Sequence, residues 1–309
     1  MRIVLVHGRK QARKIPLNEK RAWIDMVEQG LRHNGYSVTI NENDVRFAYY
    51  GNALESQARG LPESEVIVLN DGEVLSDETV VPPDEEEFAI AVLKDVADEL
   101  GVDYRIALAP DAEFGELGFR NNPILRRLLQ LLNEHAPTLG IASLFWATRD
   151  VYAYATDPEF QRRLDAAVAT AMSADDSNIV VAHSLGSVVA LSTLLAGESQ
   201  HNWSVPLFLT LGSPLGVTAI HDRLRNRRYP RSVARWLNAF DERDVVSLTP
   251  LDDSDFPPGG IENHHQVQNT SDDHHGVAEY LQDPVVAKAL FEALTNKAFG
   301  GSPSADNKL

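Results

Sequence analysis

Residues 178–190, which read Asn-Ile-Val-Val-Ala-His-Ser-Leu-Gly-Ser-Val-Val-Ala, join a β-branched apolar run to an apolar helix pattern through a very short turn. A buried strand that leads directly into a helix is the typical unit of a parallel sheet. Ala182 and Gly186 lie two residues before and after Ser184, and a sharp strand-to-helix turn needs small side chains at both positions. The run therefore predicts that the Ser184 hydroxyl lies exposed at the end of a strand of the sheet. This position makes Ser184 a candidate nucleophile.

The helix that begins after Ser184 would direct its free N–H groups toward the serine. Attack by Ser184 on a carbonyl group would create an oxyanion, and the Leu185 amide is expected to donate a hydrogen bond to it. A small-x-Ser-x-Gly pattern also arises by chance in chains of this length. The interpretation therefore depends on partners elsewhere in the sequence.

The chain has 309 residues with 43% hydrophobic content, which is enough for a large core. We expect one α/β domain over residues 1–299, with residues 51–155 as an insertion or lid, and a disordered polar tail over residues 300–309. The absence of cysteine excludes disulfides and thiolate chemistry and fits a reducing compartment. We therefore expect a cytoplasmic protein.

The chain is strongly acidic, with 28 Lys and Arg against 45 Asp and Glu and a net charge of −17. This charge argues against nucleic acid as a partner, because phosphate binding needs a basic face. The basic cluster Arg9, Lys10, Arg13 and Lys14 either meets an anionic part of a substrate or pairs with neighbouring acids. No apolar stretch suits a transmembrane segment, while association with a membrane surface and the oligomeric state stay open.

Strand and helix patterns alternate along the chain, which predicts a mostly parallel sheet flanked by helices. We expect strands at residues 3–6, 37–40, 45–50, 65–69, 179–181, 206–211 and 233–240. We expect helices at residues 18–33, 86–100, 123–135, 158–172, 188–195 and 277–296, the last with a break allowed at Pro284.

The helix at residues 123–135 is apolar around more than half of its circumference. Its apolar residues are Ile124, Leu125, Leu128, Leu129, Leu131 and Leu132. Such a helix either packs in the core or a dimer interface, or forms a mobile lid that meets a lipid-like substrate. Both interpretations stay open.

A serine hydroxyl needs an imidazole to accept its proton and a carboxylate to orient the imidazole. Asp244 follows the strand at residues 233–240 beyond a tight turn, and Asp241 is the alternative acid. His274 and His275 precede the final helix and are the candidate bases. The other candidate histidines for this role are His7, His183, His264 and His265.

The acidic and histidine-rich residues 262–275 lack a spacing that preorganises metal ligands, so we expect neither a metal nor a cofactor.

Together these segments resemble the α/β-hydrolase superfamily, specifically its lipase-like and esterase-like serine hydrolases, over residues 1–50 and 157–296. The resemblance is carried by Ala182-His183-Ser184-Leu185-Gly186, by His7-Gly8 after the first strand, and by Leu-Gly-Ser-Pro at residues 211–214. It implies that the backbone of Arg9 contributes to the oxyanion hole beside Leu185, and that Asp244 is the acid. A tyrosine five residues after the last histidine favours His275 over His274 as the base.

The resemblance implies a serine hydrolase that cleaves carboxylic esters through Ser184, His275 and Asp244 and an acyl-enzyme. The substrate would be a small-molecule or lipid ester, while thioesters and amides need no different machinery. The alternative from another class is a non-catalytic interaction protein that keeps the fold.

Overall fold

The computed structural model describes residues 1–8, 14–51, 66–68, 74–76, 82–105, 123–136, 140–224 and 226–295. The expected tail at residues 300–309, the oxyanion candidate Arg9, and Lys10 and Arg13 of the basic cluster lie outside the described residues. The same holds for much of the expected insertion at residues 51–155.

The centre of the protein is a six-stranded sheet in the order β2-β1-β5-β6-β7-β8, in which every neighbouring pair is parallel. Its strands are β1 (Arg2–Val6), β2 (Val45–Ala48), β5 (Ser177–His183), β6 (Ser204–Leu211), β7 (Trp236–Ala239) and β8 (Glu262–His264). Apolar runs suit such strands because helices cover both faces of a parallel sheet. The expected α/β class with a parallel sheet is thus confirmed.

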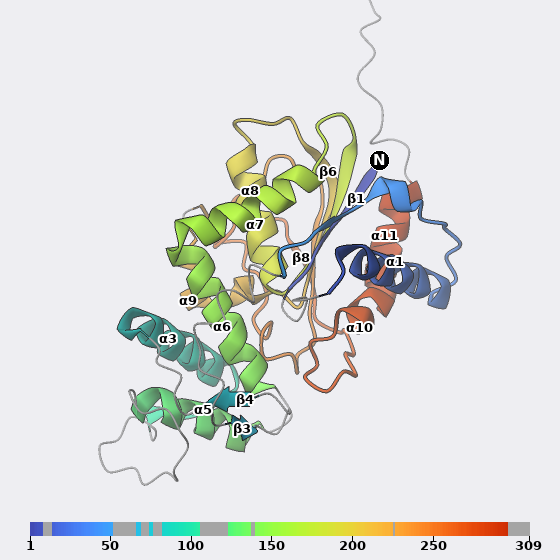
Figure 1. Cartoon of the computed structure of the whole chain (residues 1–309). Coiled ribbons are helices and arrows are strands. Elements are labelled where there is room, and N and C mark those ends of the chain that lie inside the picture. The colour runs from blue at the N-terminus through green and yellow to red at the C-terminus, as the bar shows by residue number, and fades with distance from the viewer. Residues whose placement is uncertain are drawn as a thin grey trace, which may run out of the picture.

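Helices cover the sheet on both sides (Figure 1). One layer contains α1 (Pro16–His33), α10 (Val277–Gln282) and α11 (Pro284–Thr295), and the other contains α7 (Pro158–Ala171) and α8 (Leu185–Gly197). Each face of the sheet has its own hydrophobic core, which we call the α1 core and the α8 core after the helix that covers it. Successive side chains of β5 alternate between them: Ile179 and Val181 pack in the α1 core, and Val180 and Ala182 pack in the α8 core. The sheet is therefore buried on both faces.

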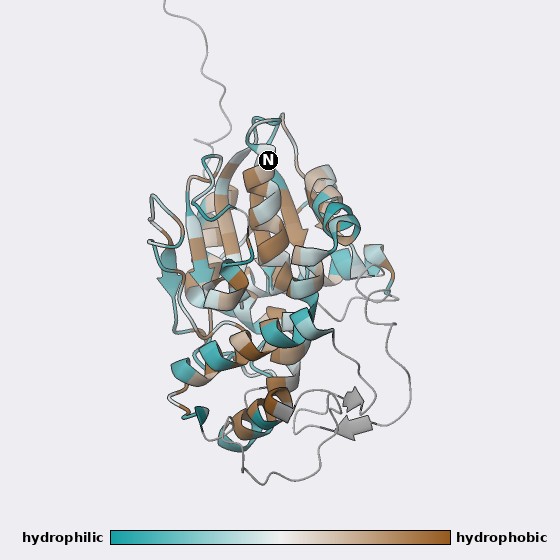
Figure 2. Ribbon diagram, turned by 90° about the vertical axis from the view of Figure 1, so that its left-hand side faces the viewer, coloured by the Kyte–Doolittle hydropathy of each residue, from teal (hydrophilic) through white to brown (hydrophobic). Residues whose placement is uncertain are grey.

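A second group of elements lies beyond the carboxyl ends of the strands (Figures 1 and 2). It comprises α3 (Pro83–Glu99), α5 (Pro123–His135), α6 (Ile141–Thr156) and the antiparallel pair β3 (Val66–Val68) and β4 (Val74–Ser76). Three further short helical elements of the described residues are η1 (Glu42–Asp44), η2 (Pro214–Gly216) and α9 (Thr218–His221).

The leucine-rich helix α5 buries its apolar face in this group. Leu125, Leu128, Leu129 and Leu132 are buried, and α5 packs against α3 and α6. This packing agrees with the core interpretation of the helix. Its role as a lid stays a prediction.

The prediction of a strand at residues 37–40 is wrong. These residues form no strand, and the Ile40 N–H donates to Glu28 Oε1 of α1 at 3.1 Å. Val38 and Ile40 are partly buried and pack against the α1 core without joining the sheet. Their alternation with polar residues therefore reflects contact with the helix layer and not strand pairing. The partner of β1 is instead β2, whose Val45 lies opposite Ile3.

The expected break at Pro284 is confirmed, because α10 and α11 meet there and the Asp283 carboxylate accepts from the Val285 and Val286 amides at 2.8 and 3.1 Å. The helix α6 and the short edge strand β8 had no counterpart among the expected elements. Among the described residues, no helix combines the length and the apolar character needed to cross a membrane.

Candidate active site

Ser184 is the single residue between β5 and α8. Its backbone angles are φ 56° and ψ −132°, a region that residues with a side chain rarely adopt and that costs about 1–3 kcal/mol. The Ser184 N–H donates to the Leu211 carbonyl at 3.0 Å, which continues the β5–β6 pairing one residue past the strand. A strained turn held at the carboxyl edge of a sheet is the geometry expected for a nucleophile.

The end of β1 lies against this turn. A Cβ atom on Gly8 would lie 2.7 Å from Ser184 Cβ, and one on Gly186 would lie 2.5 Å from the Val6 carbonyl oxygen. Neither position accepts a side chain without displacing backbone or Ser184 itself. The small residues around Ser184 and the glycine after His7 therefore allow two strand ends and a helix to meet at one place.

Two buried serines connect the turn to the loop after β6. The Ser187 hydroxyl donates to the Ser184 carbonyl at 2.6 Å, and its oxygen lies 2.7 Å from Ser213 Oγ. Since Ser187 uses its proton on the carbonyl, Ser213 is the donor in the second bond. Ser213 Oγ also accepts from the Leu215 amide at 3.3 Å. This chain of hydrogen bonds holds the Ser184 backbone relative to the neighbouring loop.

Asp244 and His275 form a hydrogen-bonded pair, with 2.7 Å between His275 Nδ1 and Asp244 Oδ2. Asp244 is fully buried, at 0% exposure, in the loop that follows β7. Its Oδ1 accepts from the Val246 amide at 3.0 Å, and its Oδ2 also accepts from the Tyr280 hydroxyl at 2.5 Å. Because Nδ1 carries the proton toward a carboxylate, the lone pair of His275 is on Nε2.

The Asp244–His275 pair lies beside the backbone that binds Ser184. A Cβ atom on Gly212, the residue after Leu211, would lie 2.9 Å from Asp244 Oδ2 and 3.0 Å from His275 Nδ1. A second link runs through His183, whose Nε2 lies 2.9 Å from the His275 carbonyl oxygen. His183, which precedes Ser184 in the chain, thus bonds the His275 backbone. Gly212, which follows the residue that binds the Ser184 amide, lies against the His275 ring.

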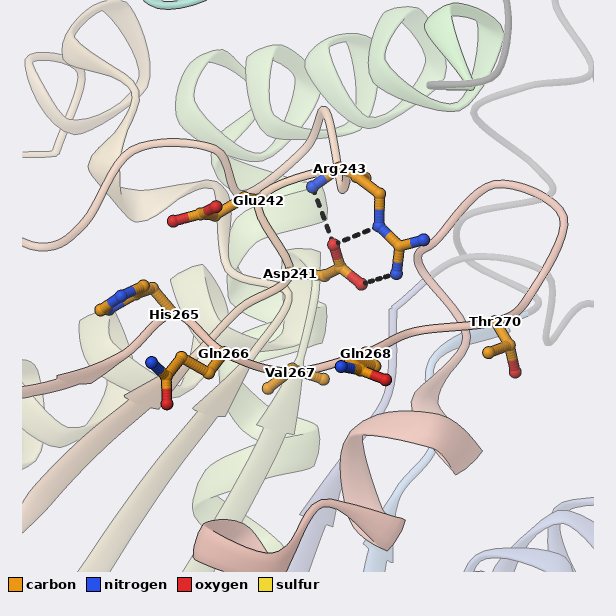
Figure 3. Close-up of a pocket in the computed structure, with 8 residues that line it drawn as sticks. All are labelled: Asp241, Glu242, Arg243, His265, Gln266, Val267, Gln268 and Thr270. Atoms are coloured by element: carbon orange, nitrogen blue, oxygen red, sulfur yellow. Dashed lines mark hydrogen bonds and ion pairs between the residues drawn. The ribbon is translucent and has the colours of Figure 1, made fainter.

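The alternative acid Asp241 has a different set of partners. It receives two hydrogen bonds from the Arg243 guanidinium, at 2.7 and 3.0 Å, and one from the Asn269 amide at 2.6 Å. Burial alone would raise the pKa of Asp241, but these bonds lower it below its usual value. Asp241 and Arg243 line a groove of about 810 Å³ together with Gln266 and Gln268, and Figure 3 shows the Asp241–Arg243 pair among these residues. Asp241 therefore anchors a loop by an ion pair.

The alternative histidines also have partners of their own. His274 has a positive φ of 53°, and its Nδ1 lies 2.8 Å from the Asn269 carbonyl oxygen. His264 Nε2 lies 3.0 Å from Asp283 Oδ1, and His265 lines the groove of Figure 3. The structure thus brings His275, and not these three, against Asp244.

His7 is a neutral structural histidine. The Tyr50 amide donates to His7 Nε2 at 3.0 Å, so the ring proton is on Nδ1, which donates to the Gly8 carbonyl at 2.6 Å. The Tyr50 hydroxyl donates in turn to the His7 carbonyl. Burial lowers the pKa of His7 to about 4, which keeps the ring uncharged at neutral pH.

His183 is neutral for the same reason. Burial lowers the pKa of His183 well below its usual value, and the nearby His275 lowers it further. Its Nε2 therefore donates a proton to the His275 carbonyl, and the two rings lie 4.6 Å apart. His183 positions the backbone of His275 and is not itself a base for Ser184.

Leu185 is the first residue of α8, so its N–H has no carbonyl partner within the helix. This amide follows Ser184 directly, as the oxyanion prediction requires, whereas its expected companion Arg9 is outside the described residues. Among the residues with described positions, no group of three or more His, Asp and Glu is arranged to hold a metal ion.

Reasoning from the sequence missed the Ser187–Ser213 bond, the contact of His183 with His275 and the role of Tyr50. Only Ser213 carried a signal, because it belongs to the Leu-Gly-Ser-Pro run at residues 211–214. Comparison of the chain with protein-family models, curated proteins and solved structures finds no match.

Proposed function

We propose that this protein is a serine hydrolase of the α/β-hydrolase type that cleaves carboxylic esters through an acyl-enzyme. The observation that carries the proposal is the pairing of His275 with the buried Asp244, at 2.7 Å, next to Gly212, which follows the Leu211 whose carbonyl binds the Ser184 amide. A carboxylate-bound imidazole next to a serine on a tight turn is the arrangement that activates a hydroxyl at neutral pH.

In the proposed reaction, Ser184 Oγ attacks the ester carbonyl carbon while His275 Nε2 accepts its proton. Asp244 holds the Nδ1 proton and stabilises the imidazolium that forms. The Leu185 amide, with the Arg9 amide as the second expected donor, binds the oxyanion. The imidazolium then returns the proton to the leaving alcohol, and water hydrolyses the acyl-enzyme by the same steps.

The sequence-based expectation of a lipid-like ester depended on α5 as a lid, and because its leucines are buried against α3 and α6 they do not distinguish lipid-like esters from small soluble esters. The same machinery would act on thioesters or amides. We therefore propose an ester substrate and leave the acyl chain length to the experiment.

Labelling with a fluorophosphonate probe tests the nucleophile, and hydrolysis of p-nitrophenyl esters of graded chain length tests the reaction. We expect the wild-type protein to label and to hydrolyse, and Ser184→Ala to do neither. Ser173→Ala is the matched control, because Ser173 is also a buried serine but lies before the start of β5, where it bonds Asp176.

A folded wild-type protein that does not label would refute the proposal and favour a non-catalytic interaction protein. Activity that persists in Ser184→Ala would show that another residue is the nucleophile. Equal loss in Ser173→Ala would trace the effect to general damage to the fold.

A further inference from the structure

We propose that Tyr280 is a positioning residue that holds the Asp244 carboxylate in the orientation in which it accepts the hydrogen bond from the His275 Nδ1–H. This inference rests on the proposed function, since it assigns a role within the same site. It is carried by the contacts of one buried hydroxyl group.

The Tyr280 hydroxyl donates to Asp244 Oδ2 at 2.5 Å, the same oxygen that accepts from His275 Nδ1 at 2.7 Å. Tyr280 is fully buried, at 0% exposure. Burial raises the pKa of Tyr280 well above its usual value, and the adjacent Asp244 raises it further. The phenol therefore keeps its proton at neutral pH and donates it in a hydrogen bond to the carboxylate.

The carboxylate needs this donor because it is buried away from water. A buried carboxylate must satisfy both oxygens with hydrogen bonds, and the directions of those bonds determine its orientation. Oδ1 is held by the Val246 amide at 3.0 Å. With Tyr280 in place, Oδ2 has two donors that approach from two segments. Without it, His275 would be the one remaining donor to Oδ2 among the described contacts, and the carboxylate would be freer to turn about its Cβ–Cγ bond.

The position of Tyr280 in the chain explains how it also fixes the distance between the acid and the base. His275 ends the loop before α10, and Tyr280 lies on α10 itself. The tyrosine oxygen also accepts from the Asp241 amide at 3.3 Å and lies 3.4 Å from Ser247 Oγ. The hydroxyl thus ties the helix that follows the base to both ends of the loop that carries the acid.

The chain offers a matched control in Tyr154. Tyr154 is also buried, and its hydroxyl donates to a carboxylate oxygen, Asp165 Oδ1, at the same distance of 2.5 Å. Asp165 belongs to α7 and is not among the described contacts of Ser184, Asp244 or His275. Tyr154→Phe therefore removes the same kind of bond at a place outside the site.

We expect Tyr280→Phe to lower kcat for ester hydrolysis roughly 10- to 100-fold while KM stays within about twofold, because the phenol is fully buried behind Asp244 and is not exposed to bind substrate. Tyr154→Phe should leave kcat unchanged, even if both variants lose a similar amount of melting temperature. Wild-type kcat in a folded Tyr280→Phe protein, or an equal loss of kcat in Tyr154→Phe, would overturn the positioning role.

A second readout does not require turnover. The His275 Nδ1 proton bound to Asp244 should give a low-field proton resonance in histidine-labelled protein, assigned by its absence in His275→Gln. We expect this resonance to shift or broaden in Tyr280→Phe and to stay in place in Tyr154→Phe. An unmoved resonance in Tyr280→Phe overturns the inference. If the wild-type protein neither labels nor hydrolyses esters, the proposed function fails, and this resonance alone decides the role of Tyr280.

Discussion

The substitution Gly212→Ala adds one methyl group directly beside the Asp244–His275 pair. The new Cβ would lie 2.9 Å from Asp244 Oδ2 and 3.0 Å from both His275 Nδ1 and Cε1. Ordinary contacts between such atoms begin at about 3.5 Å, so the methyl group overlaps its neighbours by roughly half an ångström. Gly212 also has φ 53°, which an alanine adopts only with strain.

Two terms contribute to the expected loss of stability. The positive φ costs about 1–2 kcal/mol, offset by about 0.4–1 kcal/mol because alanine restricts the unfolded chain. Overpacking against the pair costs about 1–3 kcal/mol more. We therefore expect Gly212→Ala to lower the free energy of unfolding by about 2–4 kcal/mol.

Gly35→Ala measures the cost of the positive φ without the cost of overpacking. Gly35 has φ 79°, and a Cβ atom there would meet no atom within 4 Å. This variant should lose only the backbone term, about 1 kcal/mol, and keep full activity. In Gly212→Ala, a displaced imidazole should lower kcat about 10-fold or more, since a misplacement of about 1 Å costs on the order of 100-fold.

The assays are urea unfolding and the hydrolysis of a p-nitrophenyl ester. If Gly212→Ala loses no more stability than Gly35→Ala and hydrolyses the ester at the wild-type rate, the pair does not lie beside Gly212, and the geometry of the site is refuted.

Asp244→Asn should lower kcat by about three to four orders of magnitude, because an amide cannot hold His275 in the required tautomer. Asp241→Asn should mainly reduce the free energy of unfolding. A larger loss of kcat in Asp241→Asn than in Asp244→Asn would assign the catalytic acid to Asp241. His275→Ala should cost several orders of magnitude in turnover and His274→Ala far less, and a larger loss in His274→Ala would move the base by one residue. Because burial lowers the pKa of His7 to about 4, the unfolded chain binds more protons than the folded chain below about pH 6.5, and stability falls as the pH falls. His7 should account for about 2 kcal/mol of the loss between pH 7 and pH 5, and urea unfolding of His7→Gln should show a loss smaller by this amount; an identical loss would contradict a neutral, buried His7.

The sequence by itself determined the features that depend on neighbours along the chain. The β-branched run and the small residues around Ser184 predicted the strand-to-helix turn, and the alternation of strands and helices predicted the parallel sheet. Pro284 predicted the break before α11. These features follow from local sterics and from periodicity, which a sequence displays directly.

Other features were decided only by the tertiary structure. Residues 37–40 alternate like a strand, yet they pack on the helix layer, because β2 pairs with β1 instead. The leucines of α5 could cover a substrate or a core, and here they contact α3 and α6.

The same distinction applies within the site. The sequence limited the acid to Asp241 or Asp244, and the partners of the two residues separate them: Asp241 pairs with Arg243, and Asp244 with His275 and Tyr280. No spacing along the chain reveals such pairs, because hydrogen bonds between segments depend on where distant loops meet in space. Local order can therefore be read from the sequence, whereas the partner of each buried polar group depends on the packed fold.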